Sequence, residues 1–216
     1  MRMLGGLSVA TVLLVAFTVG VARLVAHPSV DDGVRLLSEG RYPSAVRALL
    51  AAIAADPDDA RAHYHLGLAY SHLGVRAGAV KQFENAVRLD PREARYHAGL
   101  AHAYREAGDA DGALRQLEEA ARLDPREPNY HVGLAGLLLD RGAVTQAVEP
   151  LRRAAVLRPH SAEIRLLLAT VLERTGDRGG TRREYEEIRR LNNEGPLAEI
   201  ARQQLRVRAP GERSFP

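Results

Sequence analysis

The chain has 216 residues, of which 46% are hydrophobic, and its 30 basic and 27 acidic side chains give a formal net charge of +3. This length suits one sizeable domain plus a short extra segment, and the composition is not that of a disordered chain. Because the sequence contains no cysteine, disulfide bonds, thiolate metal sites and a cysteine nucleophile are excluded.

An apolar segment opens the chain. The 20 residues from Met3 to Ala22 carry no charge, and a helix of that length reaches about 30 Å, the thickness of a bilayer core. Residues 1–25 are therefore predicted to form a transmembrane signal anchor, an interpretation favoured by the further apolar residues 24–26. A cleaved secretory signal peptide, with small residues at 20–22, is the alternative, and a buried helix of a soluble domain is the third interpretation.

The orientation of this segment rests on its flanking charges. Arg2 on the short amino-terminal tail favours export of the rest of the chain, whereas Arg23, Arg35 and Arg41 favour the reverse. We expect a single-pass membrane protein whose remaining residues lie outside the cytoplasm. Signal cleavage would instead give a secreted or periplasmic protein.

Residues 26–195 carry a sequence repeat with a period of 34 residues. A fixed period in this range indicates a stacked repeat architecture, in which small residues recur where two helices approach closely. Aligned on Pro57, Pro91, Pro125 and Pro159, the units share a glycine column at positions 40, 74, 108, 142 and 176, an alanine column at positions 45, 79, 113 and 147, and a large apolar column of Leu49, Phe83, Leu117, Leu151 and Tyr185.

These columns resemble the tetratricopeptide (TPR) repeat, which has two antiparallel helices, small residues at set places and a closing proline. The resemblance implies an all-α fold, a TPR α-α superhelix of about five helix-turn-helix repeats. The repeats would span residues 26–59, 60–93, 94–127, 128–161 and 162–195. Residues 196–208 are predicted to form an amphipathic capping helix with Leu197, Ile200, Ala201 and Leu205 on one face, and residues 209–216 a disordered tail.

Some positions depart from the repeat. Pro150 falls inside the second helix of the fourth repeat, where it removes a hydrogen bond and is expected to kink the helix. The fifth repeat has Thr181 in the alanine column and Asn193 in place of the closing proline, as terminal repeats that cap a stack often do. Ser29, with Asp32 three residues later, resembles a capping box that opens the first helix.

Histidines are the first candidates for chemistry. His63, His97 and His131 occupy one repeat position, but neighbouring repeats stack about 10 Å apart while zinc ligands converge at about 2 Å. We interpret them as half-buried rings in place of the usual aromatic residue. His102 and Glu106 lie one helical turn apart without an evident third ligand.

No nucleophile elbow, phosphate-binding glycine loop or H-E-x-x-H motif is present in the sequence. Adjacent carboxylates such as Glu118 and Glu119 diverge on a helix, so they do not converge on a substrate. We therefore expect no enzymatic activity, no catalytic residues, no cofactor, no metal and no small-molecule substrate.

The resemblance also implies a binding surface, because the first helices of TPR proteins line a concave groove. Transferred position by position, the groove residues are Arg61, Tyr64, Leu68, His72, Arg95, His102, Arg105, Val132, Leu139 and Leu166. This stripe mixes apolar side chains with a central basic and imidazole group, which suits an extended or helical peptide of amphipathic, acidic character. The alternative is that these residues complete the core or face water.

The sequence thus predicts a membrane-tethered TPR scaffold or adaptor that binds a protein or peptide partner in its groove, for assembly of a bacterial envelope complex. The alternative is a self-associating structural TPR protein without a groove ligand, a homo-oligomer formed through repeat faces or the capping helix. Nucleic acid is not expected as a partner, because acidic residues are interleaved with the arginines along the chain.

Overall fold

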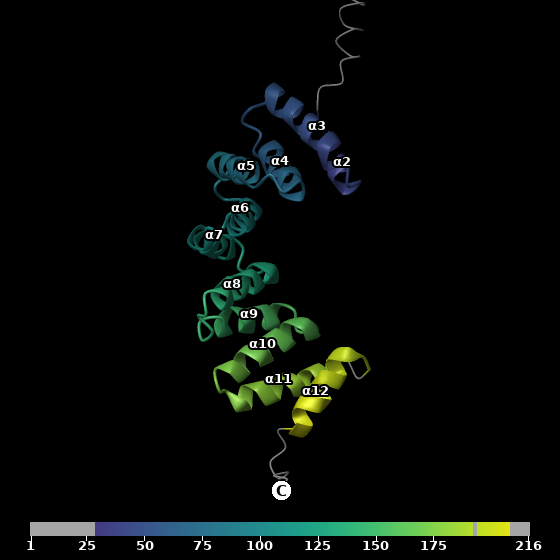
Figure 1. Cartoon of the computed structure of the whole chain (residues 1–216), viewed down its shortest axis with the longest axis vertical. Helices are drawn as coiled ribbons and strands as arrows, with labels where there is room; N and C mark the ends of the chain where they lie inside the picture. The colour runs from purple at the N-terminus through teal and green to yellow at the C-terminus, as the bar shows by residue number, and fades with distance from the viewer. Residues whose placement is uncertain (1–28, 192–193, 208–216) are drawn as a thin grey trace, which may run out of the picture.

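The structure is a computed structural model that describes residues 29–191 and 194–207. Within these residues the regular elements are all helices, and they pair in chain order, with α12 following the last pair (Figure 1). Their bounds are α2 Val30–Ser38, α3 Tyr42–Ala55, α4 Ala60–His72, α5 Arg76–Leu89, α6 Ala94–Ala107, α7 Ala110–Leu123, α8 Pro128–Asp140, α9 Val148–Leu157, α10 Ala162–Arg174, α11 Arg178–Leu191 and α12 Pro196–Val207.

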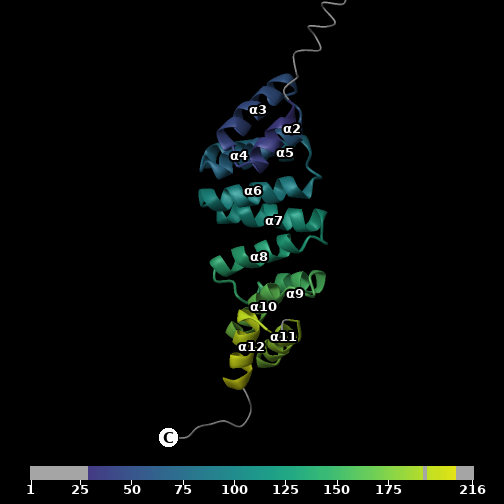
Figure 2. The ribbon, with the colours of Figure 1, turned by 90° about the vertical axis from the view of Figure 1, so that its right-hand side faces the viewer.

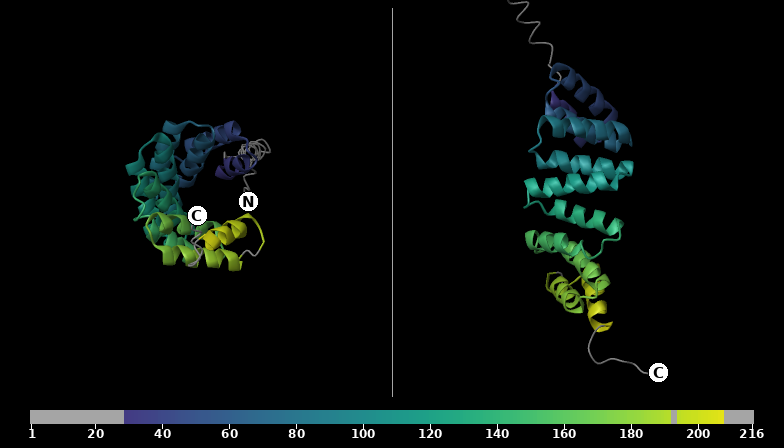
Figure 3. Two further views of the ribbon diagram at one scale, coloured as in Figure 1. Left: turned by 60° about the horizontal axis from the view of Figure 1, so that its bottom comes forward. Right: turned by 90° about the vertical axis from the view of Figure 1, so that its left-hand side faces the viewer.

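The helix pairs stack one below another along the long axis of the molecule, from α2 and α3 at the top to α12 at the bottom (Figure 2). The second helix of each pair packs on the first helix of the next, as α3 does on α4, α5 on α6, α7 on α8 and α9 on α10. First helices also contact one another directly, α2 with α4 and α4 with α6. The first helices therefore lie on the inner side of a curve that winds around the long axis (Figure 3), and the predicted all-α TPR superhelix is confirmed.

Small residues make the close helix contacts possible. The alanine column at positions 45, 79, 113 and 147 is at most 1% exposed. Each core cluster joins the second helix of one repeat to the first helix of the next: Ala45 and Leu49 of α3, for example, cluster with Leu66 and Ala69 of α4. The core is consequently a continuous series of interfaces between neighbouring repeats, as expected for a solenoid.

The recurring Asp-Pro pair builds the turn between repeats. The carboxylates of Asp56, Asp90 and Asp124 each accept a hydrogen bond from the backbone N–H two residues later, at 3.2, 3.1 and 3.1 Å. This aspartate turn satisfies a backbone donor just after the helix ends, while the proline prevents the helix from continuing. The local chemistry thus explains why this dipeptide recurs with the period of the repeat.

The glycine column ends the first helix of each pair in the left-handed backbone region. Its φ angles are 70° at Gly40, 71° at Gly74, 87° at Gly108, 74° at Gly142 and 81° at Gly176. An L-residue with a Cβ is strained in this conformation. The turn between the two helices of a repeat therefore requires glycine for its backbone angle.

Pro150 shortens a helix, whereas the sequence predicts a kink within it. The second helix of the fourth repeat, α9, begins at Val148 and has 10 residues, while its counterparts α5 and α7 have 14. Pro150 therefore lies in the first turn, where its missing N–H removes no hydrogen bond within the helix. Residues 144–147 form turns in place of the helical turn found in the other repeats.

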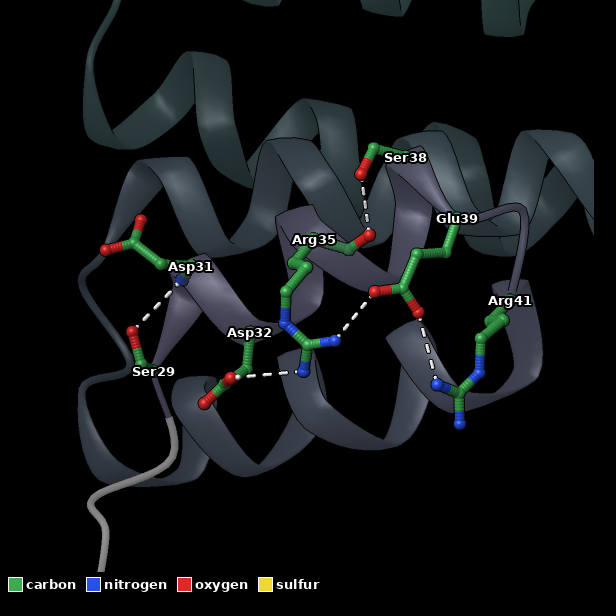
Figure 4. A network of polar contacts seen from close by, with 7 residues as sticks. All are labelled: Ser29, Asp31, Asp32, Arg35, Ser38, Glu39 and Arg41. Carbon is green, nitrogen blue, oxygen red and sulfur yellow. Dashed lines mark hydrogen bonds and ion pairs between the residues drawn. The ribbon is translucent and has the colours of Figure 1, made fainter.

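The amino end of the described chain is held by a local polar network (Figure 4). Ser29 caps α2 by accepting a hydrogen bond from the Asp31 N–H at 3.1 Å. Asp32, the expected partner in a capping box, instead pairs with Arg35, which also contacts Glu39 at 2.7 Å. The predicted cap is thus formed by the serine, while the acidic residue belongs to a surface ion-pair network.

The capping helix α12 closes the opposite end. Ala198 and Ala201 are fully buried, and Leu197 and Leu205 pack against the cluster that contains Tyr185 and Ile188 of α11. Ile200, predicted on the same apolar face, is 37% exposed.

The predicted signal anchor at residues 1–25 and the predicted tail at residues 209–216 lie outside the described residues. Among the helices that are described, none has the length and apolar character needed to cross a membrane. Asn193, predicted to replace the closing proline, also lies outside the described part of the chain.

The glycine column provides a test of this fold. Gly108 has φ of 87° and no atom within 4 Å of a Cβ built on it, so Gly108→Ala should destabilise the protein through backbone strain alone, by about 1–2 kcal/mol. Gly136 has equal space but lies inside helix α8 without a positive φ, so Gly136→Ala should stabilise by about 1 kcal/mol. Urea unfolding of both variants measures the difference, and equal effects would contradict the backbone explanation.

Candidate functional site

The histidine position forms a structural ladder on the second-helix side of the repeats. The Nε2 atoms of His63 and His97 each donate to the carbonyl oxygen of the proline six residues earlier, at 3.0 Å. Their Nδ1 atoms lie 2.7 and 2.8 Å from the side-chain amides of Gln82 and Gln116. Each histidine therefore links the turn before its helix to the second helix of its own repeat, and both rings are buried.

The contact between histidine and glutamine is not kept in the fourth and fifth repeats. His131 keeps its bond to the Pro125 carbonyl at 3.0 Å, but Pro150 occupies the position that glutamine holds in the earlier repeats. In the fifth repeat Arg165 replaces histidine, donates to the Pro159 carbonyl at 3.1 Å and pairs with Glu184 at 2.8 Å. A role in holding the repeat together explains this position, and no group of three or more potential metal ligands converges within residues 29–191 and 194–207.

The predicted groove residues lie on the first helices, on the inner side of the curve. Arg61, Tyr64, Leu68 and His72 lie on α4; Arg95, His102 and Arg105 on α6; Val132 and Leu139 on α8; and Leu166 on α10. The apolar members of this set are half-buried and pack against the core clusters beneath them. They therefore both contribute to the core and present part of their surface to the groove.

Two of the groove cations are already paired. Arg61 forms an ion pair with Asp31 at 3.2 Å, and Arg95 forms one with Glu93 at 3.0 Å. His72 stacks on Tyr42, with ring centroids 4.4 Å apart and an interplanar angle of 8°. An external anion at Arg61 or Arg95 would have to compete with these carboxylates, whose exposed ion pairs contribute about 0–1 kcal/mol each.

His102 and Arg105 differ from these residues. Both are exposed on α6, and within the described ranges neither side chain takes part in an ion pair, a hydrogen bond or a ring contact. They are neighbours on the helix, three residues apart. The centre of the groove therefore presents two adjacent basic groups that remain available to a ligand.

An aromatic group occupies the groove nearer the amino end. The ring of Tyr64 lies 5.6 Å from that of Phe83 and 5.1 Å from that of Tyr96. Such contacts add to the free energy of burying these rings. The interface between the second and third repeats is consequently filled by large side chains.

His65 is a residue that sequence reasoning missed. Its Nδ1 atom is buried and has no hydrogen-bond partner within the described structure. Burial lowers the pKa of His65, and the positive charges of Arg61 and Arg95 lower it further against weaker opposing effects of Asp59 and Asp31. The repeat offers no signal for this residue, because the equivalent positions hold Gly99, Gly133 and Leu167.

Comparison with known proteins is consistent with this architecture. A family model described as "TPR repeat" matches residues 33–74, and two described as "Tetratricopeptide repeat" match residues 60–93 and 99–162. No curated protein matches the chain.

Solved structures share the fold at low sequence identity. The crystal structure of MamA is 19% identical over 79% of this chain and 96% of that one, with a TM-score of 0.68. YrrB, described as a TPR protein with an unusual peptide-binding site, is 18% identical over 87% and 98%, with a TM-score of 0.67. PilF of Pseudomonas aeruginosa is 21% identical over 84% and 90%, with a TM-score of 0.68. At sequence identities this low, the similarity shows that these proteins share the fold of this chain.

The histidine ladder predicts a stability effect. Gln116→Ala leaves the buried Nδ1 of His97 without its partner, so the free energy of unfolding should fall by about 1–2 kcal/mol. Glu118→Ala, an exposed and unpaired neighbour on α7, should change it by less than about 0.5 kcal/mol. Urea unfolding of both variants tests this. A Gln116→Ala protein as stable as the control would refute the proposed structural role of the contact between His97 and Gln116.

The pKa of His65 predicts a pH dependence. Because the folded state binds this proton more weakly than the unfolded chain does, the contribution of His65 to stability is complete above about pH 6.5 and decreases as the pH falls below it toward the folded-state pKa. Unfolding measured between about pH 7.5 and 5.5 should show a steeper loss of stability for the parent protein than for His65→Gln. The exposed His160 provides the control, since His160→Gln should keep the parent slope.

Proposed function

Because the chain is built from tetratricopeptide repeats, we propose that it is a scaffold or adaptor that binds a segment of a protein partner along the groove formed by α4, α6, α8 and α10. The observation that carries the proposal is the pair of unpaired basic groups, His102 and Arg105, beside partly exposed apolar side chains on the inner helices. Apolar surface supplies binding free energy and the charges supply orientation and specificity. The similarity to YrrB, described as a TPR protein with an unusual peptide-binding site, supports this kind of partner.

The proposal includes a membrane tether and no catalysis. Residues 1–25 would anchor the chain as a single span, with the repeats outside the cytoplasm, where the groove would hold a component of an envelope complex during assembly. The uncharged stretch from Met3 to Ala22 supports the tether.

The second candidate function is self-association. Two apolar residues of α12 are exposed, Ile200 at 37% and Val207 at 77%. A second copy of the chain could cover them, since exposed apolar side chains at the end of a repeat stack favour association. In this case the groove would hold no foreign ligand.

A photo-crosslinking residue tests the two functions in living cells. Placed at Leu68, which lies half-buried on the inner helix α4, it should capture a discrete foreign protein, because that position contacts the proposed ligand. Placed at Arg88, which is exposed on α5, it should not capture this protein. Mass spectrometry identifies the product, and Leu139→Glu should abolish its capture by placing a charge on the apolar groove surface.

Two outcomes decide between the functions. The first outcome is that only a second copy of the chain is captured. If this capture is lost in Ile200→Glu and unaffected by Leu139→Glu, self-association replaces the groove proposal. Capture of the same foreign protein from both Leu68 and Arg88 would place the partner on the outside of the repeats and would also contradict groove binding.

A further inference from the structure

A hollow opens on the inner side of the curve between α6 and α8. It has a volume of about 150 Å³ and is lined by Ala101, His102, Arg105, Leu117, Gly133 and Leu137. Its floor is apolar, and its two basic side chains, His102 and Arg105, have no partner within the described structure. An enclosed cavity of about this size can hold a benzene molecule, so a large apolar side chain is of the right size for the hollow.

The repeat itself explains why the space is empty here. At the preceding interface, Phe83 fills the equivalent floor, and a Cβ added at Gly99 would lie 2.7 Å from its ring and 3.1 Å from the ring of Tyr64. At the interface between α6 and α8, leucine replaces the phenylalanine, and Ala98 occupies the position equivalent to Tyr64. Both changes remove an aromatic ring from the same place.

The exposure of the floor residue agrees with this comparison. Leu117 is 8% exposed, whereas its counterparts Leu49, Phe83 and Leu151 are at most 1% exposed. The three atoms nearest to a Cβ added at Gly133 all belong to Leu117, the first at 2.7 Å and the others at 3.7 and 3.8 Å. The hollow is therefore a gap in the apolar packing between α6 and α8, and it lies beside the groove residues His102 and Arg105.

The rim defines the charge of a suitable ligand. His102 and Arg105 both line the hollow from α6, whereas the other two groove arginines, Arg61 and Arg95, are each paired with a carboxylate. A guanidinium group binds a carboxylate by charge-assisted hydrogen bonds. A ligand that fills the apolar floor therefore gains further free energy if it also places a carboxylate at this rim.

We propose that the hollow is the anchor pocket for a partner segment that inserts one phenylalanine, leucine or similarly large apolar side chain and carries an aspartate or glutamate within two residues of it. The carboxylate binds Arg105 and His102, and the apolar side chain rests on Leu117, Gly133 and Leu137. This inference rests on the proposed function, because it names the partner chemistry of the same groove. A single buried anchor with a flanking charge is a common source of affinity and specificity in peptide recognition.

Leu117→Phe provides the decisive variant. It introduces at this interface the ring that Phe83 supplies at the preceding one, beneath a glycine that matches Gly99. The variant should therefore fold and fill the hollow from below without altering any charge. Arg105→Gln removes the rim charge instead and leaves the hollow open, and Arg88→Gln on the outer face is its matched control.

The probe is a random peptide library displayed on phage, selected on the full chain in lipid nanodiscs and counter-selected on empty nanodiscs. Enriched peptides should share a large apolar residue with an acidic residue within two positions. Affinity of one selected peptide, measured by fluorescence anisotropy, should fall by about tenfold or more for Leu117→Phe and for Arg105→Gln. It should be unchanged for Arg88→Gln.

The outcomes separate this inference from the proposed function. A selected peptide binds in the groove if Leu68→Glu and Leu139→Glu abolish its binding. If such a peptide keeps its affinity for Leu117→Phe, the anchor pocket is refuted and the groove function stands. Failure to enrich any peptide, or binding that survives both glutamate substitutions, would overturn both. If Leu117→Phe does not fold, the comparison of Arg105→Gln with Arg88→Gln decides, and equal affinity for these two variants would refute the inference.

Discussion

The close approach of neighbouring helices at alanine is the constraint on which the rest of the structure depends. The methyl groups at positions 45, 79, 113 and 147 are at most 1% exposed, and so are those at Ala86, Ala120 and Ala154. Larger side chains there would force the helices apart, at a cost typical of overpacked cores. With the helices this close, the large apolar residue between the two alanine positions reaches the first helix of the next repeat. The stacking of the repeats, and hence the groove, follows from that contact.

The turns keep these interfaces in register. An aspartate accepts a backbone N–H just after the second helix, and the proline that follows supplies its carbonyl oxygen to the histidine of the next first helix. The histidine in turn contacts a glutamine on the second helix of its own repeat. Aspartate, proline, histidine and glutamine thus form one polar connection from the turn to the first helix and on to the second. The replacement of histidine and glutamine by Arg165 and Glu184 preserves that connection with different chemistry.

The periodic part of the structure and the capping helix α12 could be predicted from sequence, whereas contacts between particular side chains of neighbouring helices could not. The repeat length, the glycine turns and the buried alanine column are each expressed at many positions, so their physical roles can be read without coordinates. The role of the histidines was only partly predicted, because their glutamine partners lie 19 residues away and no pattern in a single repeat links the two. Pro150 was expected to kink α9, but the helix begins later instead, since a proline is tolerated in a first turn. His65 and the hollow at Leu117 depend on side chains from neighbouring helices, and only the packed structure brings these together.

Ligand specificity in such a protein has to arise where the repeat pattern is broken. Identical repeats would present identical surfaces, and a groove lined by them would bind a segment equally well in several registers. The interface around Phe83 is stabilised by contacts between aromatic rings, and the interface at Leu117 lacks these contacts. A gap of this kind is unfavourable to the free protein, because its lining atoms lose their packing partners. A ligand that fills the gap recovers those contacts. The exchange of an aromatic ring for a leucine therefore has two consequences. It fixes the register of the ligand on the groove, and it lowers the stability of the free chain modestly.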